Sequence, residues 1–179
     1  YTTLFRSIDL EDSVPIDQKV ETRTNLLSYI ETKDFDKTIL IRVNPLDTKF
    51  GEDDISLLSD VSSKIDAFIL PKIEEADLLN DLPKNLVVLV ETPKAVKNLG
   101  QLACHENVIG IALGGADLSA TLGADMSWDS LLFTRSAIII EAAINGLFTI
   151  DSPFMNIEDI SSLKREAGLS SGLGFDGKA

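Results

Sequence analysis

Six short apolar runs recur along the chain, and they constrain the fold more than any other feature of the sequence. They are rich in Val, Ile and Leu, do not alternate with polar residues, and span residues 8–10, 39–43, 67–70, 86–90, 108–113 and 147–150. Strands of this kind are covered on both faces, which is typical of a parallel sheet. The sequence therefore predicts a buried parallel β-sheet.

Helical patterns separate these runs. A helix is expected to begin at Pro93, and Gly146 stands where a C-terminal cap belongs. The other predicted helices run from Pro15 to Ile30, Asp53 to Ile65, Trp128 to Asn145 and Ile157 to Ala167. Alternating strands and helices imply right-handed βαβ units, and hence an α/β barrel or an open doubly wound sheet. No Pro/Gly/Ser-rich linker divides the chain, so one domain is predicted.

The first seven residues, YTTLFRS, read like the translation of a common sequencing adapter and fit nothing that follows. We expect Tyr1 to Ser7 to be foreign sequence. The predicted domain then runs from Ile8 to Ala179 and begins inside a strand, which indicates a fragment.

The net charge, the cysteine content and the length of the apolar runs exclude some classes of function. The formal net charge of −13 argues against nucleic-acid binding, which needs clustered Lys and Arg, but it does not exclude a small anionic ligand. The single Cys104 can form no intramolecular disulfide, which favours a reducing, cytoplasmic setting. No apolar run approaches the roughly 20 residues that cross a bilayer, so no membrane partner is expected.

Polar side chains gather where the apolar runs end. In an α/β barrel or open α/β sheet, the carboxyl ends of the strands meet at the edge where active sites are assembled. The polar and glycine residues at these ends are Asp9, Glu11, Asp12, Arg42, Asn44, Lys72, Glu91, Gly114, Gly115, Asp117 and Asp151. This convergence predicts a functional site at that edge.

Glu91 and Asp117 are the predicted metal ligands. Two carboxylates suffice for Mg²⁺, which prefers hard oxygen ligands, and the chain has no His/Cys set for zinc. An unpaired buried carboxylate costs about 2–7 kcal/mol, and a shared cation would offset that cost for Glu91. Arg42 suits bidentate capture of a substrate carboxylate. Gly114, Gly115 and the following Ala116 would let the backbone approach a ligand and offer N–H donors.

Other interpretations stay open. An Asp or Glu after a strand often caps the next helix, and this applies to Asp9 and Asp151. The acidic residues 52–54 are expected to be a solvated helix start. His105, the only histidine, is expected at the surface. Ser119 has no His partner that could activate it, and Gly172-Leu173-Gly174 is too short for a dinucleotide fingerprint.

These residues lie in motifs that resemble the HpcH/HpaI aldolase and citrate lyase β-subunit family, particularly its acyl-thioester lyase branch. The matching blocks, in order, are IDLEDSV, ILIRVNP, AFILPKIE, VLVETPKAV, GIALGGADLSATLG, TRSAIIIEAAINGLFTIDSPF and GFDGKA. The resemblance spans Ile8 to Ala179 and implies a (β/α)₈ barrel that lacks its first strand and helix and its C-terminal end.

The resemblance also implies an activity, namely Mg²⁺-dependent cleavage or formation of a carbon–carbon bond. Glu91 and Asp117 then hold Mg²⁺, and Arg42 binds the substrate, with Gly114, Gly115 and Ala116 beside it. Glu11 or Asp12 would organise water or proton transfer. The expected substrate is a citryl, malyl or related 3-hydroxy diacid thioester of coenzyme A or acyl-carrier protein. The full-length protein is expected to form a homo-oligomer or to be a subunit of a lyase complex.

Two other functions remain possible on this fold. A class II aldolase that releases pyruvate carries a His base after the second strand; residues 9–12 contain none, so the thioester branch is favoured. The other alternative is a non-catalytic subunit. A barrel without its first strand exposes two sheet edges, so the 179-residue polypeptide is expected to be inactive and to aggregate.

Overall fold

The computed structural model describes residues 5–33, 36–59, 62–156 and 158–179 and contains one curled parallel sheet. The sheet follows chain order from β1 to β7, and every neighbouring pair is parallel. Its strands are β1 Phe5–Asp9, β2 Thr38–Arg42, β3 Ala67–Leu70, β4 Leu86–Val90, β5 Val108–Leu113, β6 Phe148–Asp151 and β7 Gly177–Lys178. The predicted parallel sheet is confirmed.

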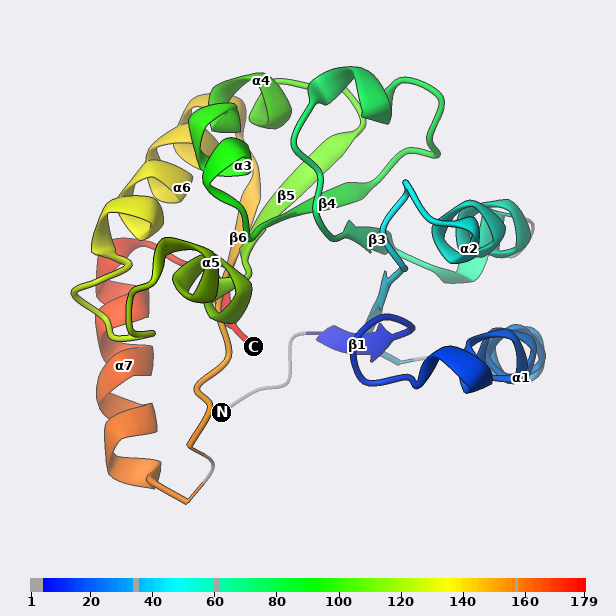
Figure 1. Cartoon of the computed structure of the whole chain (residues 1–179), viewed down its shortest axis with the longest axis horizontal. Helices are drawn as coiled ribbons and strands as arrows, with labels where there is room; N and C mark the ends of the chain where they lie inside the picture. Colours follow the sequence, from blue (N-terminus) through cyan, green and yellow to red (C-terminus); the bar gives the residue numbers. More distant parts are fainter. Residues whose placement is uncertain (1–4, 34–35, 60–61, 157) are drawn as a thin grey trace.

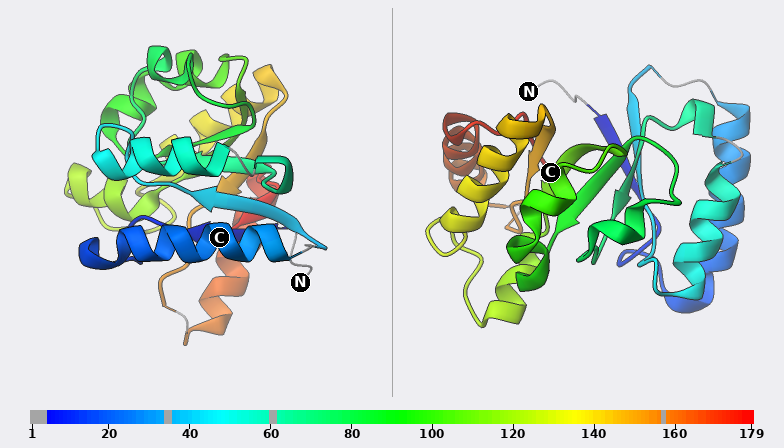
Figure 2. Two further views of the ribbon diagram at one scale, coloured as in Figure 1. Left: turned by 90° about the vertical axis from the view of Figure 1, so that its right-hand side faces the viewer. Right: turned by 90° about the horizontal axis from the view of Figure 1, so that it is seen from above.

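Helices cover the outer side of this sheet (Figures 1 and 2), with α1 and α2 at one end of the curve and α6 and α7 at the other. The α-helices are α1 Lys19–Thr32, α2 Lys49–Ser59, α3 Pro93–Lys97, α4 Leu99–Ala103, α5 Gly115–Leu122, α6 Leu132–Asn145 and α7 Ile160–Leu173. Short 3₁₀ helices are η1 Ile16–Gln18, η2 Ser62–Lys64 and η3 Ala76–Leu79. No described helix has the length and apolar character that a membrane span requires.

The strands are buried on both faces, as their composition predicts. In β4, Val88 and Val90 belong to the larger apolar cluster, which includes residues of the covering helices. Val87 and Leu89 of the same strand belong to a smaller cluster, formed by strand residues on the concave side. This double burial explains the continuous apolar runs.

The two edge strands approach each other without pairing. No ladder joins β1 to β7 in the part of the chain that the structure describes. A Cβ added at Gly177 in β7 would nevertheless lie 3.5 Å from the ring of Phe5 in β1. The observed architecture is a half-barrel, and closure into eight strands stays a prediction.

Several boundaries differ from the predictions. Phe5, Arg6 and Ser7 pair with residues 38–40 of β2, so the strand begins three residues before the predicted domain start. Residues 1–4 lie outside the described part, and the foreign origin of residues 1–7 stays a prediction. Helix α2 begins at Lys49 and not at Asp53, because the hydroxyl of Thr48 accepts the N–H of Gly51 in its first turn.

The last predicted helix also differs. Helix α7 begins at Ile160 after Asp159, whose side chain accepts the N–H of Ser162 as an N-cap. It continues through Gly168 and ends only at Gly174, which adopts a left-handed φ of 117°. The predicted start, Ile157, lies outside the described residues.

Candidate active site

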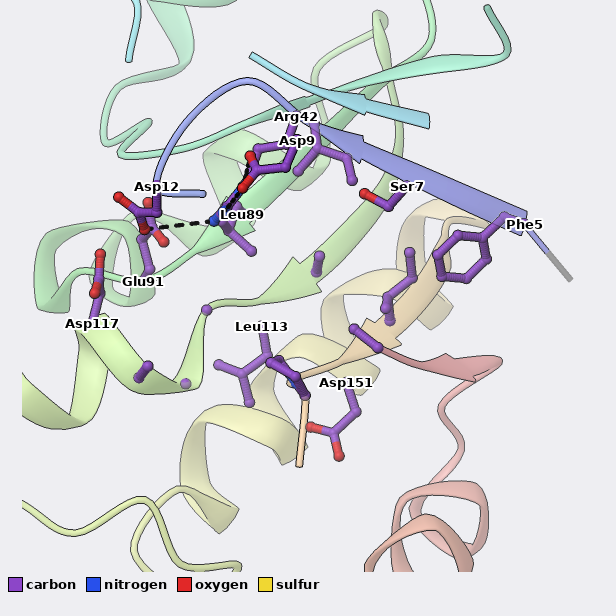
Figure 3. A pocket seen from close by; sticks show the side chains of 18 residues that line it. Phe5, Ser7, Asp9, Asp12, Arg42, Leu89, Glu91, Leu113, Asp117 and Asp151 are labelled. Atoms are coloured by element: carbon purple, nitrogen blue, oxygen red, sulfur yellow. Dashed lines mark hydrogen bonds and ion pairs between the residues drawn. The ribbon is translucent and has the colours of Figure 1, made fainter. Parts of the chain in front are cut away.

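A cavity of about 280 Å³ opens at the carboxyl ends of the strands. It contains most of the predicted site residues (Figure 3), because parallel strands deliver the residues that follow them to one edge. Its polar and glycine lining includes Asp9, Asp12, Arg42, Glu91, Gly114, Gly115, Asp117 and Asp151, together with Ala116. Glu11 does not line the cavity but lies buried beside Arg42.

Arg42 is held by two acidic residues of the β1 end. Its Nε and Nη2 donate to the two carboxylate oxygens of Asp9 at 2.8 and 2.7 Å, a bidentate pair. Its Nη1 lies 2.9 Å from Oε2 of Glu11. Burial alone would raise the pKa of Asp9, but hydrogen bonds from Arg42 and nearby N–H groups hold it well below its usual range. The bidentate edge of Arg42 is therefore occupied by Asp9.

Glu11 is a buried carboxylate with incomplete partners. Both of its oxygens lack a hydrogen bond of good geometry among the described residues, although Arg42 and Lys72 form ion pairs with them at 2.9 and 3.4 Å. Burial raises its pKa, which these two cations only partly counteract. Glu11 is thus a poorly satisfied acid next to the cavity.

Glu91 directly follows β4 and lines the cavity. It is 3% exposed, and its Oε1 accepts the backbone N–H of Lys72 at 2.8 Å. Burial, and then the nearby carboxylates of Glu11 and Asp117, raise the pKa of Glu91 to about 7. Figure 3 shows Asp12, Glu91 and Asp117 grouped at the same end of the cavity. This crowding of carboxylates is costly unless a cation joins them.

Asp117 and the glycines before it are placed by helix α5. Asp117 lies in the first turn of α5, where a negative charge is favourable. A Cβ at Gly114 would lie 2.4 Å from the Cβ of Glu91, and one at Gly115 would lie 3.0 Å from Ser152. The close approach predicted for these glycines is to the protein itself. The N–H of Gly114 donates to the carbonyl of Val90 at 2.9 Å and is not free for a ligand.

The carboxylate pair fits a small divalent cation. No group of three or more His, Cys, Asp or Glu is arranged around a common metal position within the described ranges. Mg²⁺ keeps several waters or substrate atoms and needs only one or two protein carboxylates. Glu91 and Asp117 supply that number, and the raised pKa of Glu91 marks a place where positive charge would be stabilising.

A buried polar network supports the loop after β1. Lys19 donates to the carbonyls of Leu10 and Glu11 at 3.0 and 2.8 Å and to the Asn44 side chain at 2.6 Å. Asn44 and Arg23 in turn hydrogen-bond to Asp54. Asp54 is fully buried, so its predicted position in a solvated helix start is wrong. Its partners come from α1 and the end of β2, which no local pattern reveals.

Asp151, at the end of β6, has its charge balanced by cations. It is fully buried, accepts from Nε of Arg135 at 2.8 Å and lies 3.2 Å from Nζ of Lys178. It is not a helix cap, and both oxygens are engaged.

Asp9 likewise pairs with Arg42 and also accepts the N–H groups of Glu11 and Ser13.

Lys72 is among the residues predicted at this edge of the sheet but has no predicted role, and in the structure it contacts both Glu11 and Glu91. It follows β3 with a φ of 55°, a left-handed conformation uncommon for a non-glycine residue. The signal in the sequence was its position directly after a strand. His105 lies away from this edge, against Asn80, in agreement with its prediction.

Comparisons with known proteins identify the family of this chain. The sequence model of the HpcH/HpaI aldolase/citrate lyase family matches residues 7–85 and 80–179. The chain belongs to this family. A (3S)-malyl-CoA thioesterase of Cereibacter sphaeroides is 31% identical over 95% of this chain and 62% of its own length. The citrate lyase subunit beta of Haemophilus influenzae is 30% identical over 96% of this chain and 65% of its own.

A solved structure confirms the relationship at the level of the fold. The citrate lyase beta subunit of M. tuberculosis, complexed with oxaloacetate and magnesium, superposes with a TM-score of 0.84 at 27% identity. The match covers 97% of this chain and 79% of that one. The chain spans about three fifths of the length of the curated relatives named here.

Proposed function

We propose that the full-length protein is a Mg²⁺-dependent carbon–carbon lyase. Its substrate would be a 3-hydroxy diacid acyl thioester such as a malyl or citryl thioester. The enzyme would cleave this thioester to an acetyl thioester and a 2-oxo acid, or form it from these two products. The observation that carries this proposal is the buried carboxylate of Glu91 with Glu11 and Asp117 beside it. Burial first, and then these two carboxylates, raise the pKa of Glu91 to about 7. Such carboxylates at the mouth of a parallel half-barrel suit a cation and an acidic substrate.

Glu91 and Asp117 would hold the metal. When bound, Mg²⁺ supplies a Lewis acid that polarises a carbonyl oxygen and orients a 2-oxo acid. The magnesium and oxaloacetate named for the citrate lyase beta structure support this assignment. Gly114 contributes by leaving room for Glu91, because a side chain in its place would collide with that carboxylate.

Arg42 would stabilise negative charge that develops on the substrate. Asp9 fixes its guanidinium by the bidentate pair, so the group needs little reorganisation when substrate binds. Glu11 and Asp12, whose carboxylates lie 2.9 and 3.8 Å from Nη1 of Arg42, would take part in proton transfer or organise water. Burial raises the pKa of Glu11, which is the direction that favours a carboxyl group able to donate a proton.

Thioester hydrolysis is a second candidate, supported by the name of the malyl-CoA thioesterase relative. The same thioester would then give a free acid and coenzyme A. Coenzyme A is the carrier that the malyl-CoA thioesterase relative supports, and an acyl-carrier protein is the alternative proposed.

Assembly into a homo-oligomer is proposed for the full-length protein. Phe133, Ile140 and Ile144 on α6 are 77%, 59% and 70% exposed. Their spacing of seven and four residues places them on one outward helix face. On a chain with a net charge of −13, an apolar face allows two copies to meet with little charge repulsion.

The test of the proposed activity uses the full-length protein with malyl-CoA and citryl-CoA. With Mg²⁺ present, we expect acetyl-CoA and a 2-oxo acid, and loss of turnover after chelation. Glu91→Gln should lower turnover by about 10³-fold, the order expected for loss of a metal ligand. Asp53→Asn, at a half-buried position that does not line the cavity, should not lower it. Free malate with coenzyme A would favour the thioesterase, and full turnover by Glu91→Gln would exclude the metal assignment.

A further inference from the structure

Two cationic side chains reach the carboxylate cluster in the described part of the chain, Arg42 and Lys72. Three donor nitrogens of Arg42 are directed at acids of its own chain, two at Asp9 and one at Glu11. Among the residues that the structure describes, the ammonium of Lys72 forms an ion pair with Glu11 at 3.4 Å, and its side chain is 46% exposed. The ammonium of Lys72 therefore has more capacity to bind an incoming anion.

The backbone of Lys72 is fixed at the same place. Its N–H donates to Oε1 of Glu91 at 2.8 Å, so the residue is anchored to the acid that directly follows β4. Its φ of 55° is a conformation that lysine rarely adopts, and strained residues of this kind concentrate at functional sites. This conformation brings the main chain of Lys72 to Glu91 while its side chain reaches Glu11.

The local charge balance calls for such a cation. Asp9, Glu11, Asp12, Glu91 and Asp117 are all carboxylates, whereas Arg42 and Lys72 are the cations paired with members of this group. An anionic substrate entering this region meets repulsion unless a cation faces it. A lysine on a flexible stem can leave a weak 3.4 Å ion pair to make that contact.

We propose that the ammonium of Lys72 binds a carboxylate of the substrate's 2-oxo acid portion and so selects acidic substrates. The inference rests on the proposed function and adds to it a specificity residue in the loop after β3. Lys72 is a binding residue in this account, because its side chain contacts the substrate and its main chain supports Glu91.

The test measures binding of oxaloacetate to the full-length, Mg²⁺-loaded protein by calorimetry. Lys72→Gly removes the ammonium but keeps the peptide N–H for Glu91, and glycine adopts a left-handed φ without strain. Asn85→Gly is the matched control, because Asn85 has a similar φ of 66° and lies at the opposite end of β4. Lys72→Arg keeps the positive charge.

We expect Lys72→Gly to weaken oxaloacetate binding at least tenfold and to leave coenzyme A binding unchanged. Lys72→Arg should retain most of the affinity, and Asn85→Gly all of it. Equal oxaloacetate affinity in Lys72→Gly and wild type would overturn the proposal. A loss of affinity for coenzyme A alone would also overturn it, because it would mean that the ammonium of Lys72 binds a phosphate of coenzyme A. An equal loss in Asn85→Gly would also overturn it.

Turnover of malyl-CoA and citryl-CoA, measured in parallel, separates the two proposals. If wild type cleaves a thioester while Lys72→Gly binds oxaloacetate normally, only the role of Lys72 is wrong. If wild type neither binds oxaloacetate nor cleaves a thioester, both proposals are wrong.

Discussion

Glu91 and Asp151 occupy equivalent places in the sheet but have opposite surroundings. Each lies at the carboxyl end of a strand, β4 and β6, each is buried, and each lines the same cavity. Asp151 has Arg135 at 2.8 Å and Lys178 at 3.2 Å. Glu91 has a backbone N–H and neighbouring carboxylates. The difference indicates that the buried charge of Asp151 is compensated by cations of its own chain, whereas that of Glu91 is poorly compensated and is available for a ligand.

The largest expected effect on stability is at Asp151. Asp151→Asn would remove the carboxylate nearest to the buried Arg135 and leave it only the more distant Glu166, at 3.7 Å. Removing one partner of a buried ion pair typically costs about 3–5 kcal/mol of unfolding free energy. Chemical denaturation of the full-length protein measures this change. Asp53→Asn is the control, because Asp53 is only half-buried, pairs with the exposed Lys49 and lies 3.7 Å from Arg23. Its replacement should cost far less than that of Asp151, because partly exposed ion pairs contribute little to stability. A loss below about 1 kcal/mol at Asp151 would contradict the contrast between the two acids.

The pH dependence of the metal-free protein provides the next test. The pKa of Glu91 is about 7 in the folded state, above the ordinary value of 4.5, so the folded state binds the extra proton between these pH values. Stability should therefore fall as pH rises from about 4.5 to 7, by up to about 3 kcal/mol. Denaturation of wild type and Glu91→Gln in chelator at pH 5 and 8 isolates this contribution. A parallel loss in both proteins would show that Glu91 does not cause it.

A smaller effect is expected at Gly114. An alanine Cβ there would lie 2.4 Å from the Cβ of Glu91, so Gly114→Ala should cost about 1–3 kcal/mol and weaken Mg²⁺ binding. Gly168→Ala is the comparison, because a Cβ at this position in α7 meets nothing within 4 Å. It should stabilise the helix by about 0.5–1 kcal/mol. Similar losses in both variants would rule out a specific role for Gly114.

The sequence predicted the strands best where every residue of the strand is buried. The strands Ala67–Leu70, Leu86–Val90 and Val108–Leu113 match their predicted runs, because residues covered on both faces are apolar throughout. Helix ends were less predictable, since caps such as Thr48 and Gly174 depend on which of several candidates the tertiary structure uses.

The location of the site could be predicted from the sequence, but which acid pairs with which cation could not. The order of strands brings Arg42, Glu91 and Asp117 to one edge, which the apolar runs already imply. Which acid is neutralised depends on contacts between distant elements, such as Arg135 with Asp151 or Arg23 with Asp54. The role proposed for Lys72 likewise depends on a backbone conformation that has no local sequence signature.

Thermal unfolding of the full-length wild type and Glu91→Gln at pH 8, with chelator and with saturating Mg²⁺, shows whether Glu91 holds the cation. A ligand that binds only the folded state raises Tm. Mg²⁺ should raise the Tm of wild type and not that of Glu91→Gln, and in chelator the variant should melt at or above wild type, because it lacks the buried charge. Equal Mg²⁺ shifts in both proteins, or a lower Tm of the variant in chelator, would contradict the account.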